Sequence, residues 1–161
     1  INVLKRIVKY FNLKNVTLFE TALGNTEGEI TMVMPIISAV RMQGLSHVVH
    51  QSITENNEGE KCVVPLKMLD TMPELTHNKK RIAAIKIDVE NFEFFALDGA
   101  QELIKKNQPI IYAELWDNEN RVNCFQLLKK LNYNTYIVQN KGLIAFNPAI
   151  HRTQNFIFKP Q

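Results

Sequence analysis

Three acidic residues gather where a predicted core strand meets a predicted helix. The stretch IKIDVENFEFFALDGA opens with the apolar residues Ile85 and Ile87. Asp88, Glu90 and Glu93 then follow, before the helical pattern begins. Burying carboxylates costs free energy unless they meet hydrogen-bond donors, a metal ion or a cationic ligand. In open parallel sheets, ligands bind outside the carboxyl ends of the strands. The position of these acids therefore predicts a ligand site.

Other polar residues stand at the ends of two further predicted strands. Glu114 lies near the end of PIIYAELW, and Asp117 and Asn118 follow it directly. Thr21 and Ala22 end the first predicted strand of the chain. If these strands are neighbours in one sheet, their carboxyl ends converge on one crevice. We therefore group these residues with the three acids as one candidate site.

Structural roles explain the same acids. Carboxylates near a helix N-terminus gain about 0.3–1 kcal/mol from the helix dipole, which suits Glu90 and Glu93. Asp88 can cap the turn before the helix. Glu114 can occupy a half-exposed position at a strand edge. The sequence leaves both interpretations open for each residue.

The predicted elements alternate between strands and helices. Helices are expected over 1–11, 91–106 and 122–131, with a helical turn that ends at Pro73; strands are expected over 16–22, 28–35, 46–52, 62–65, 82–90, 109–116, 133–140 and 155–160. Near-continuous apolar strands predict a mostly parallel sheet with helices on both faces. The last two strands are expected to pair antiparallel at one edge. Residues 36–60 show no sustained period and predict an irregular insertion or flap.

Composition and charge indicate one domain over residues 1–161, with 45% hydrophobic residues. The net charge of +3, with acids and bases interleaved, does not indicate a nucleic acid or an anionic membrane as partner. No apolar run approaches the roughly 20 residues of a membrane span, and no signal peptide is recognisable. Cys62 and Cys124 lie far apart, which predicts two free thiols in a reducing, cytoplasmic compartment.

The chain begins inside a helical pattern. Apolar residues fall at helical spacing from Val3 to Phe11, and no capping residue precedes Ile1. We therefore expect the natural protein to contain residues before Ile1. An incomplete sheet edge would favour self-association into a homo-oligomer.

The central block IKIDVENFEFFALDGAQELIKKNQPIIYAEL resembles the signature region of FkbM-family methyltransferases. That pattern runs K-I-D-V-E-G-x-E, then a leucine and Gly-Ala, a lysine-rich helix end, and a proline before a strand ending in Glu. The matching positions are Lys86, Asp88, Val89, Glu90, Glu93, Leu97, Gly99, Ala100, Leu103, Pro109 and Glu114. The segments NVTLFETALGNTEGEIT and NFIFKP fit the family as well. Asn91 replaces the usual glycine, and asparagine adopts left-handed backbone more readily than most residues.

The resemblance implies a Rossmann-like class I methyltransferase fold and S-adenosylmethionine as methyl donor. The acceptor it implies is a hydroxyl oxygen of a small molecule or carbohydrate. Thr21 and Ala22 would lie near the adenine, and Asp88 near the cationic methionine end of the donor. Glu90 is the first choice for general base or acceptor anchor, and Glu114 the second. The family's glycine-rich donor turn is expected before Ile1, since the sequence holds no G-x-G-x-x-G pattern.

Further features allow more than one interpretation. His47 and His50 would share one face of a helix but lie on opposite faces of a strand. Trp116 can stack on a ligand or pack at the rim of the core. Asp88, Glu114, Asp117 and Asn118 could together hold Mg²⁺, although no metal is part of the main prediction.

Two rival functions remain at this point. One is a methyltransferase-like domain that lost its donor site and serves as an interaction module. The other is a different nucleotide-binding α/β protein, which fits the order of elements but explains the acidic central block less well. A bound donor product would argue against both.

Overall fold

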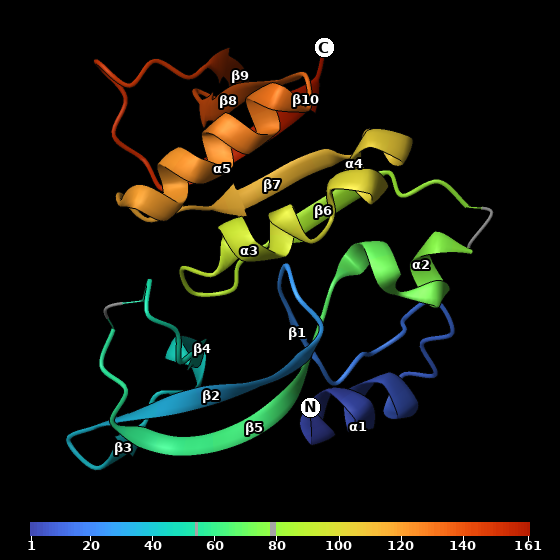
Figure 1. The fold of residues 1–161 in the computed structure, drawn as a ribbon, viewed down its shortest axis with the longest axis vertical. Coiled ribbons are helices and arrows are strands. Elements are labelled where there is room, and N and C mark those ends of the chain that lie inside the picture. The colour runs from blue at the N-terminus through green and yellow to red at the C-terminus, as the bar shows by residue number, and fades with distance from the viewer. Residues whose placement is uncertain (54, 78–79) are drawn as a thin grey trace.

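The computed structural model describes residues 1–53, 55–77 and 80–161, which form two five-stranded mixed sheets (Figure 1). The N-terminal sheet has the strand order β1-β5-β2-β3, and β4 also pairs with β2. Its strands are β1 (Ala22–Leu23), β2 (Gly28–Ile37), β3 (Val40–Arg41), β4 (His47–Val48) and β5 (Gly59–Lys67). The pairing of β1 with β5 is parallel, whereas β2 pairs antiparallel with β3, β4 and β5.

The C-terminal sheet has the strand order β6-β7-β10-β8-β9. Its strands are β6 (Ala84–Ile87), β7 (Ile110–Glu114), β8 (Tyr133–Gln139), β9 (Gly142–Ala145) and β10 (Asn155–Pro160). β6 and β7 are parallel, and β10 runs antiparallel to both β7 and β8. Because β10 is reversed relative to both of its neighbours, β6, β7 and β8 point in the same direction.

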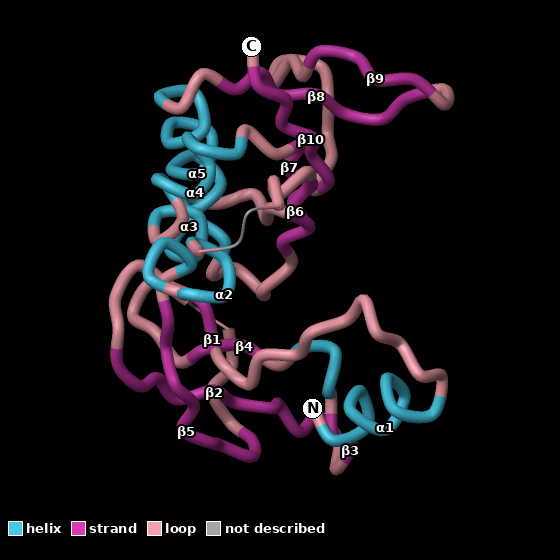
Figure 2. The backbone as a smooth tube through the Cα atoms, turned by 90° about the vertical axis from the view of Figure 1, so that its right-hand side faces the viewer, coloured by secondary structure: helices cyan, strands magenta, loops and turns pink. Residues whose placement is uncertain are grey.

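Helices cover one face of the C-terminal sheet (Figure 2). They are α3 (Glu93–Asp98), α4 (Gln101–Asn107) and α5 (Glu119–Lys130); α1 (Asn2–Tyr10), α2 (Pro73–Thr76) and the 3₁₀ turns η1 (Gln43–Leu45) and η2 (Leu69–Thr71) lie elsewhere in the chain. The predicted mostly parallel sheet with helices on both faces is therefore wrong in two respects. Most strand pairs are antiparallel, and the second face carries no helix among the described residues.

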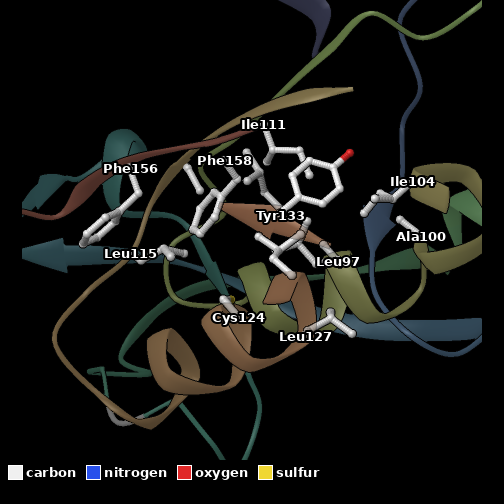
Figure 3. Packing of buried hydrophobic residues seen from close by; sticks show 14 of the residues in the cluster. Leu97, Ala100, Ile104, Ile111, Leu115, Cys124, Leu127, Tyr133, Phe156 and Phe158 are labelled. Atoms are coloured by element: carbon white, nitrogen blue, oxygen red, sulfur yellow. The ribbon is translucent and has the colours of Figure 1, made fainter. Parts of the chain in front are cut away.

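The physical reason is that an apolar run reports burial and not strand direction. The last two predicted strands, β8 and β10, do pair antiparallel, as expected. However, β10 lies inside the sheet between β7 and β8, and the unpredicted strand β9 forms that edge. Phe156 and Phe158 of β10 are fully buried in the main core (Figure 3).

The main core lies between α3, α4, α5 and the C-terminal sheet (Figure 3). Its buried members are Ile87, Ala96, Leu97, Ala100, Ile104, Ile111, Ala113, Leu115, Cys124, Leu127, Leu128, Tyr133, Ile137, Phe156 and Phe158. Fully burying one large apolar side chain contributes about 1.5–3 kcal/mol. Burial raises the pKa of the Cys124 thiol, and both Cys124 and Cys62 are free thiols, as expected.

A single helix was expected over 91–106, but the structure breaks it into α3 and α4 at Gly99 and Ala100. The Asp70 carboxylate of η2 accepts hydrogen bonds from the backbone N–H groups of Glu102 (3.0 Å) and Leu103 (2.8 Å), so it caps α4 from outside the helix. At the same point, the backbone of Gly99 lies directly against the carbonyl oxygen of Gly24. Both partners come from segments distant in sequence, which explains why local spacing did not predict the break.

Other boundaries also differ from the sequence expectations. The first predicted strand, over 16–22, is reduced to Ala22–Leu23, and β6 covers only four residues of the predicted 82–90. The helical turn expected before Pro73 is the 3₁₀ turn η2, which ends at Thr71, and Pro73 then begins the separate helix α2, in keeping with the preference of proline for the first helical position. The predicted strand over 46–52 is the two-residue β4.

The first helix is present as expected, but all of its residues are outside the core. Figure 2 shows α1 apart from the helices of the C-terminal sheet. Across the described ranges, no helix combines the length and the apolar character that crossing a bilayer requires.

Gly99→Ala is expected to lower the free energy of unfolding by about 1–3 kcal/mol, because the added methyl group overlaps the Gly24 carbonyl. Gly142→Ala is the matched control, since its nearest neighbouring atom would lie 3.7 Å away. Urea unfolding of both variants measures the difference. Equal stability of the two variants would contradict the close contact between Gly24 and Gly99.

Candidate functional site

A cavity of about 400 Å³ lies at the carboxyl end of β6, between residues of the two sheets. We call it the strand-end cavity. Its lining residues are Thr21, Ala22, Leu23, Met32, Gly44, Ser46, Val48, Asp88, Val89, Glu90 and Phe92. Of the five residues to which the family resemblance gives a role, the structure thus brings together four: Thr21, Ala22, Asp88 and Glu90. The fifth, Glu114, is not among the lining residues.

A tight turn over residues 89–92 places Glu90 in the wall of this cavity. Glu90 and Asn91 both have positive φ angles, 49° and 70°, and the N–H of Phe92 donates to the carbonyl of Val89 at 3.3 Å. Two consecutive positive φ angles are typical of a type I′ turn. Asn91 therefore keeps the left-handed backbone that the family pattern assigns to glycine. For Glu90, the left-handed conformation costs about 1–2 kcal/mol.

Glu93 holds this turn from inside the protein. Its side chain is 3% exposed, and its carboxylate accepts a hydrogen bond from the N–H of Val89 at 2.9 Å. Burial raises the pKa of the Glu93 carboxyl, while the backbone hydrogen bonds act in the opposite direction. Glu93 does not line the strand-end cavity, so the structural interpretation fits it better than a direct role in ligand binding.

Asn91 joins the turn to two other parts of the chain. Its side-chain amide donates to Glu55 Oε1 at 3.2 Å. Its amide oxygen accepts from the side chain of Asn118 at 2.7 Å, and Asn120 donates to its backbone carbonyl at 2.9 Å. The sequence indicated a glycine-like backbone at Asn91, but it carried no sign of this amide network.

Asp88 and Glu114 lie next to each other at the ends of adjacent parallel strands. The register pairs Ile87 with Ala113, so the following residues of β6 and β7 are neighbours. Asp88 forms an ion pair with Lys86 at 2.7 Å, and this hydrogen bond is the main cause that raises the pKa of Lys86. Asp88 is therefore partly neutralised, whereas no ion pair involves Glu90 within the described part of the chain.

The carboxyl of Glu90 in the strand-end cavity is affected by burial and by several neighbouring charges. Its partial burial raises the pKa of its carboxyl, and repulsion from Asp88, Glu93 and Glu114 raises that pKa further. A protonated His47 ring would act in the opposite direction. A positively charged ligand group beside these carboxylates would relieve their mutual repulsion. The cavity is therefore suited to a cationic ligand.

Thr21 and Ala22 form the opposite wall of the strand-end cavity. The Thr21 hydroxyl donates to the carbonyl of Pro65 at 2.7 Å, and Ala22 pairs with Leu66 in the sheet. Since its single proton is engaged with the backbone, Thr21 Oγ1 can still accept a hydrogen bond from a ligand.

The two histidines considered from the sequence, His47 and His50, have different environments. His47 of β4 is 3% exposed. The ring of His50 packs against the rings of Phe92 and Phe95, at centroid distances of 5.4 and 4.7 Å. These contacts assign His50 to packing. Phe92 and Phe95 belong to a hydrophobic cluster with Val48, Ile53 and Leu66, whereas Phe94 packs against the main core.

The structure does not assemble the alternative magnesium site. Asp117 pairs with Arg121, and the Asn118 side chain caps α5 by accepting from the N–H of Arg121 at 3.3 Å. Across residues 1–53, 55–77 and 80–161, no group of three or more His, Cys, Asp or Glu residues is arranged to hold a metal ion.

Glu90→Gly is expected to be more stable to unfolding than Glu90→Ala by about 1 kcal/mol, because only glycine adopts a positive φ without a steric penalty. Urea unfolding midpoints measure the difference. The same two substitutions at Glu102, an exposed residue of α4, provide the control. There alanine is expected to be the more stable by about 0.5–1 kcal/mol. The same order at both positions would contradict the left-handed turn.

Comparisons with known proteins agree with the sequence pattern. The methyltransferase FkbM domain model matches residues 4–148. A crystal structure of a methyltransferase FkbM from Methylobacillus flagellatus is similar to this chain, with a TM-score of 0.56 and 11% sequence identity over 98% of the chain. This chain spans 33% of the length of that protein. No curated protein sequence matches this chain. The α/β fold and the extent of the domain match show that the chain belongs to the FkbM methyltransferase domain family.

Proposed function

We propose that this chain forms part of an S-adenosylmethionine-dependent methyltransferase that acts on a hydroxyl oxygen of a small molecule or sugar. The observation that carries the proposal is the convergence of Asp88 and Glu90 with Thr21 and Ala22 on one cavity. Its volume of about 400 Å³ falls within the range of small-molecule sites, about 300–1,000 Å³. Membership of the FkbM family supports the reaction class.

The residues of the strand-end cavity fit the chemistry of this donor. Its methionine end carries two positive groups, the sulfonium and the amino group, and the carboxylates of Asp88 and Glu90 supply the opposite charge. The acceptor lone pairs of Thr21 Oγ1 suit the amino group of an adenine at the other wall. Leu23, Met32 and Val48 provide apolar surface between the two ends.

S-adenosylmethionine supplies an electrophilic methyl group on sulfur and leaves as S-adenosylhomocysteine when an acceptor oxygen takes the methyl carbon and loses its proton. The protein's task is to align the reactants, since methyl transfer is a direct displacement. Glu90 faces the cavity and anchors the acceptor hydroxyl in this proposal. Glu114 acts on Glu90 through its charge and does not line the cavity.

Titration calorimetry of S-adenosylhomocysteine into the full natural protein tests the donor site. We expect binding that weakens at least tenfold, about 1.4 kcal/mol, in Asp88→Asn, because the variant removes a charge from the cavity wall. Asp117→Asn is the matched control, since it makes the same chemical change on a side chain that is 85% exposed and outside the cavity.

Absence of binding to the folded protein would overturn the proposal and favour a non-catalytic domain that serves as an interaction module. Equal weakening in Asp88→Asn and Asp117→Asn would show that net charge, and not the cavity, governs the affinity.

A further inference from the structure

A second cavity, of about 110 Å³, adjoins the strand-end cavity, and Glu90 lines both. Its lining residues are Pro35, Ile37, Leu45, His47, Glu55, Asn56, Glu90 and Trp116. We call it the flap cavity, because most of its lining belongs to residues 36–60. Besides apolar side chains, its walls hold the acceptors of His47, Glu55 and Glu90 and the amide of Asn56, whose oxygen already accepts from the N–H of Glu58 at 2.8 Å.

The first acceptor is a ring nitrogen of His47. The other ring nitrogen, Nδ1, lies 2.9 Å from the carbonyl oxygen of Leu45. A carbonyl oxygen only accepts, so Nδ1 carries the proton, and Nε2 of the neutral ring is left with a free lone pair. Nε2 is buried and meets no hydrogen-bond partner in the part of the chain that the structure describes, and the whole residue is only 3% exposed. A buried polar atom of this kind is unfavourable unless a ligand or water satisfies it.

The second acceptor is one oxygen of Glu55. Glu55 Oε2 is buried and has no hydrogen-bond partner within residues 1–53, 55–77 and 80–161, while Oε1 accepts from the side chain of Asn91 at 3.2 Å. Asn118 and Asn120 in turn hold Asn91. The Glu55 carboxylate is thus held against the turn at residues 89–92. Its free oxygen therefore has a fixed position in the cavity, although Glu55 lies on an irregular loop.

The hydrogen-bond donors that these acceptors lack indicate the chemistry of the ligand. His47 Nε2, Glu55 Oε2 and the Glu90 carboxylate all require hydrogen-bond donors. Pro35, Ile37 and Leu45 offer apolar surface for a carbon skeleton, and Trp116 adds an aromatic ring. A dry apolar cavity of about 150 Å³ holds a benzene molecule, so 110 Å³ accommodates an arm of roughly five heavy atoms. A short chain with neighbouring hydroxyl groups meets all of these requirements.

We propose that the flap cavity receives a hydroxyl-bearing arm of a polyol or sugar, and that His47 Nε2 accepts the proton of the hydroxyl that is methylated. The inference rests on the proposed methyltransferase function and adds the cavity in which the acceptor binds and the residue that takes its proton. A hydroxyl placed beside Glu90 lies at the boundary between the two cavities. The neighbouring carboxylates of Glu55 and Glu90 stabilise the positive charge that His47 gains with the proton.

NMR of the wild-type protein with ¹⁵N-labelled histidine tests the acceptor site without requiring turnover. The probe is propane-1,2-diol, and 1-methoxypropane is the matched compound with the same number of heavy atoms and no donor. We expect the His47 Nε2 resonance to shift saturably with the diol and to stay unchanged with the ether. An equal response to both compounds, or none to the diol, would overturn the inference.

Variants assign the effect to His47. His47→Phe keeps a ring of similar size but removes the acceptor, and we expect it to bind the diol at least tenfold more weakly. His47→Gln, which retains a polar side chain, is expected to recover part of the affinity and covers the case in which His47→Phe does not fold. His50→Phe is the matched control, because the His50 ring packs on Phe92 and Phe95 outside the flap cavity. Unchanged binding in both His47 variants would contradict the assignment.

Calorimetry with S-adenosylhomocysteine separates this inference from the proposed function. We expect His47→Phe to retain binding of S-adenosylhomocysteine, since His47 does not line the strand-end cavity. Donor-product binding without diol binding would overturn the acceptor site and leave the methyltransferase function standing. Diol binding without binding of S-adenosylhomocysteine would overturn the proposed methyltransferase function, and the role of His47 in methyl transfer would be overturned with it.

Discussion

The left-handed turn at residues 89–92 is the constraint on which the site depends. It reverses the chain directly after β6, so that Glu90 faces the cavities while Glu93 begins α3 inside the core. Glu90 does not favour this backbone conformation, and the turn is held from both sides. The Glu93 carboxylate bonds Val89, and the amide network of Asn91 reaches α5 and the loop that carries Glu55. Strain of this kind persists only where the surrounding contacts outweigh it, and it is common at functional sites.

The same turn lies at the junction of the two hydrophobic clusters. Val89 packs against the main core of the C-terminal sheet and also against the smaller cluster around Phe92 and Leu66. The Gly24–Gly99 contact and the Asp70 cap also join the two halves of the chain, the N-terminal half with the first sheet and the C-terminal half with the second. Both cavities occur where residues of the two halves meet around Glu90. The position of the site is thus a consequence of how the halves are joined.

Sequence reasoning grouped Asp88 and Glu90 with Thr21 and Ala22, and these residues do line one cavity. The expected reason was wrong, because β1 belongs to the N-terminal sheet and β6 to the C-terminal sheet, so the cavity lies between two sheets and not at the edge of one. Sequence reasoning predicted the antiparallel pairing of β10 with β8 but not the position of β10 between β7 and β8, because the apolar pattern of Phe156 and Phe158 indicates burial and not which strands lie on either side. It also left the roles of His47 and Glu55 open or unnoticed. Residues 36–60 have no period, and the contacts that fix Glu55 come from Asn91, 36 residues away.

The electrostatics of the ligand-free site also bear on its purpose. Burial and the repulsion from Asp88, Glu93 and Glu114 disfavour the charged form of Glu90, while His47 Nε2 and Glu55 Oε2 are buried without hydrogen-bond partners among the described residues. Each feature lowers the stability of the free protein, and packing alone accounts for none of them. A cation in the larger cavity and hydroxyl donors in the smaller one would satisfy all three groups. Because a ligand that binds only the folded state stabilises it, binding of the donor and of the acceptor would each offset part of this destabilisation. The two cavities share Glu90, so occupation of one changes the charge environment of the other, and the donor and acceptor sites are expected to be coupled through this residue.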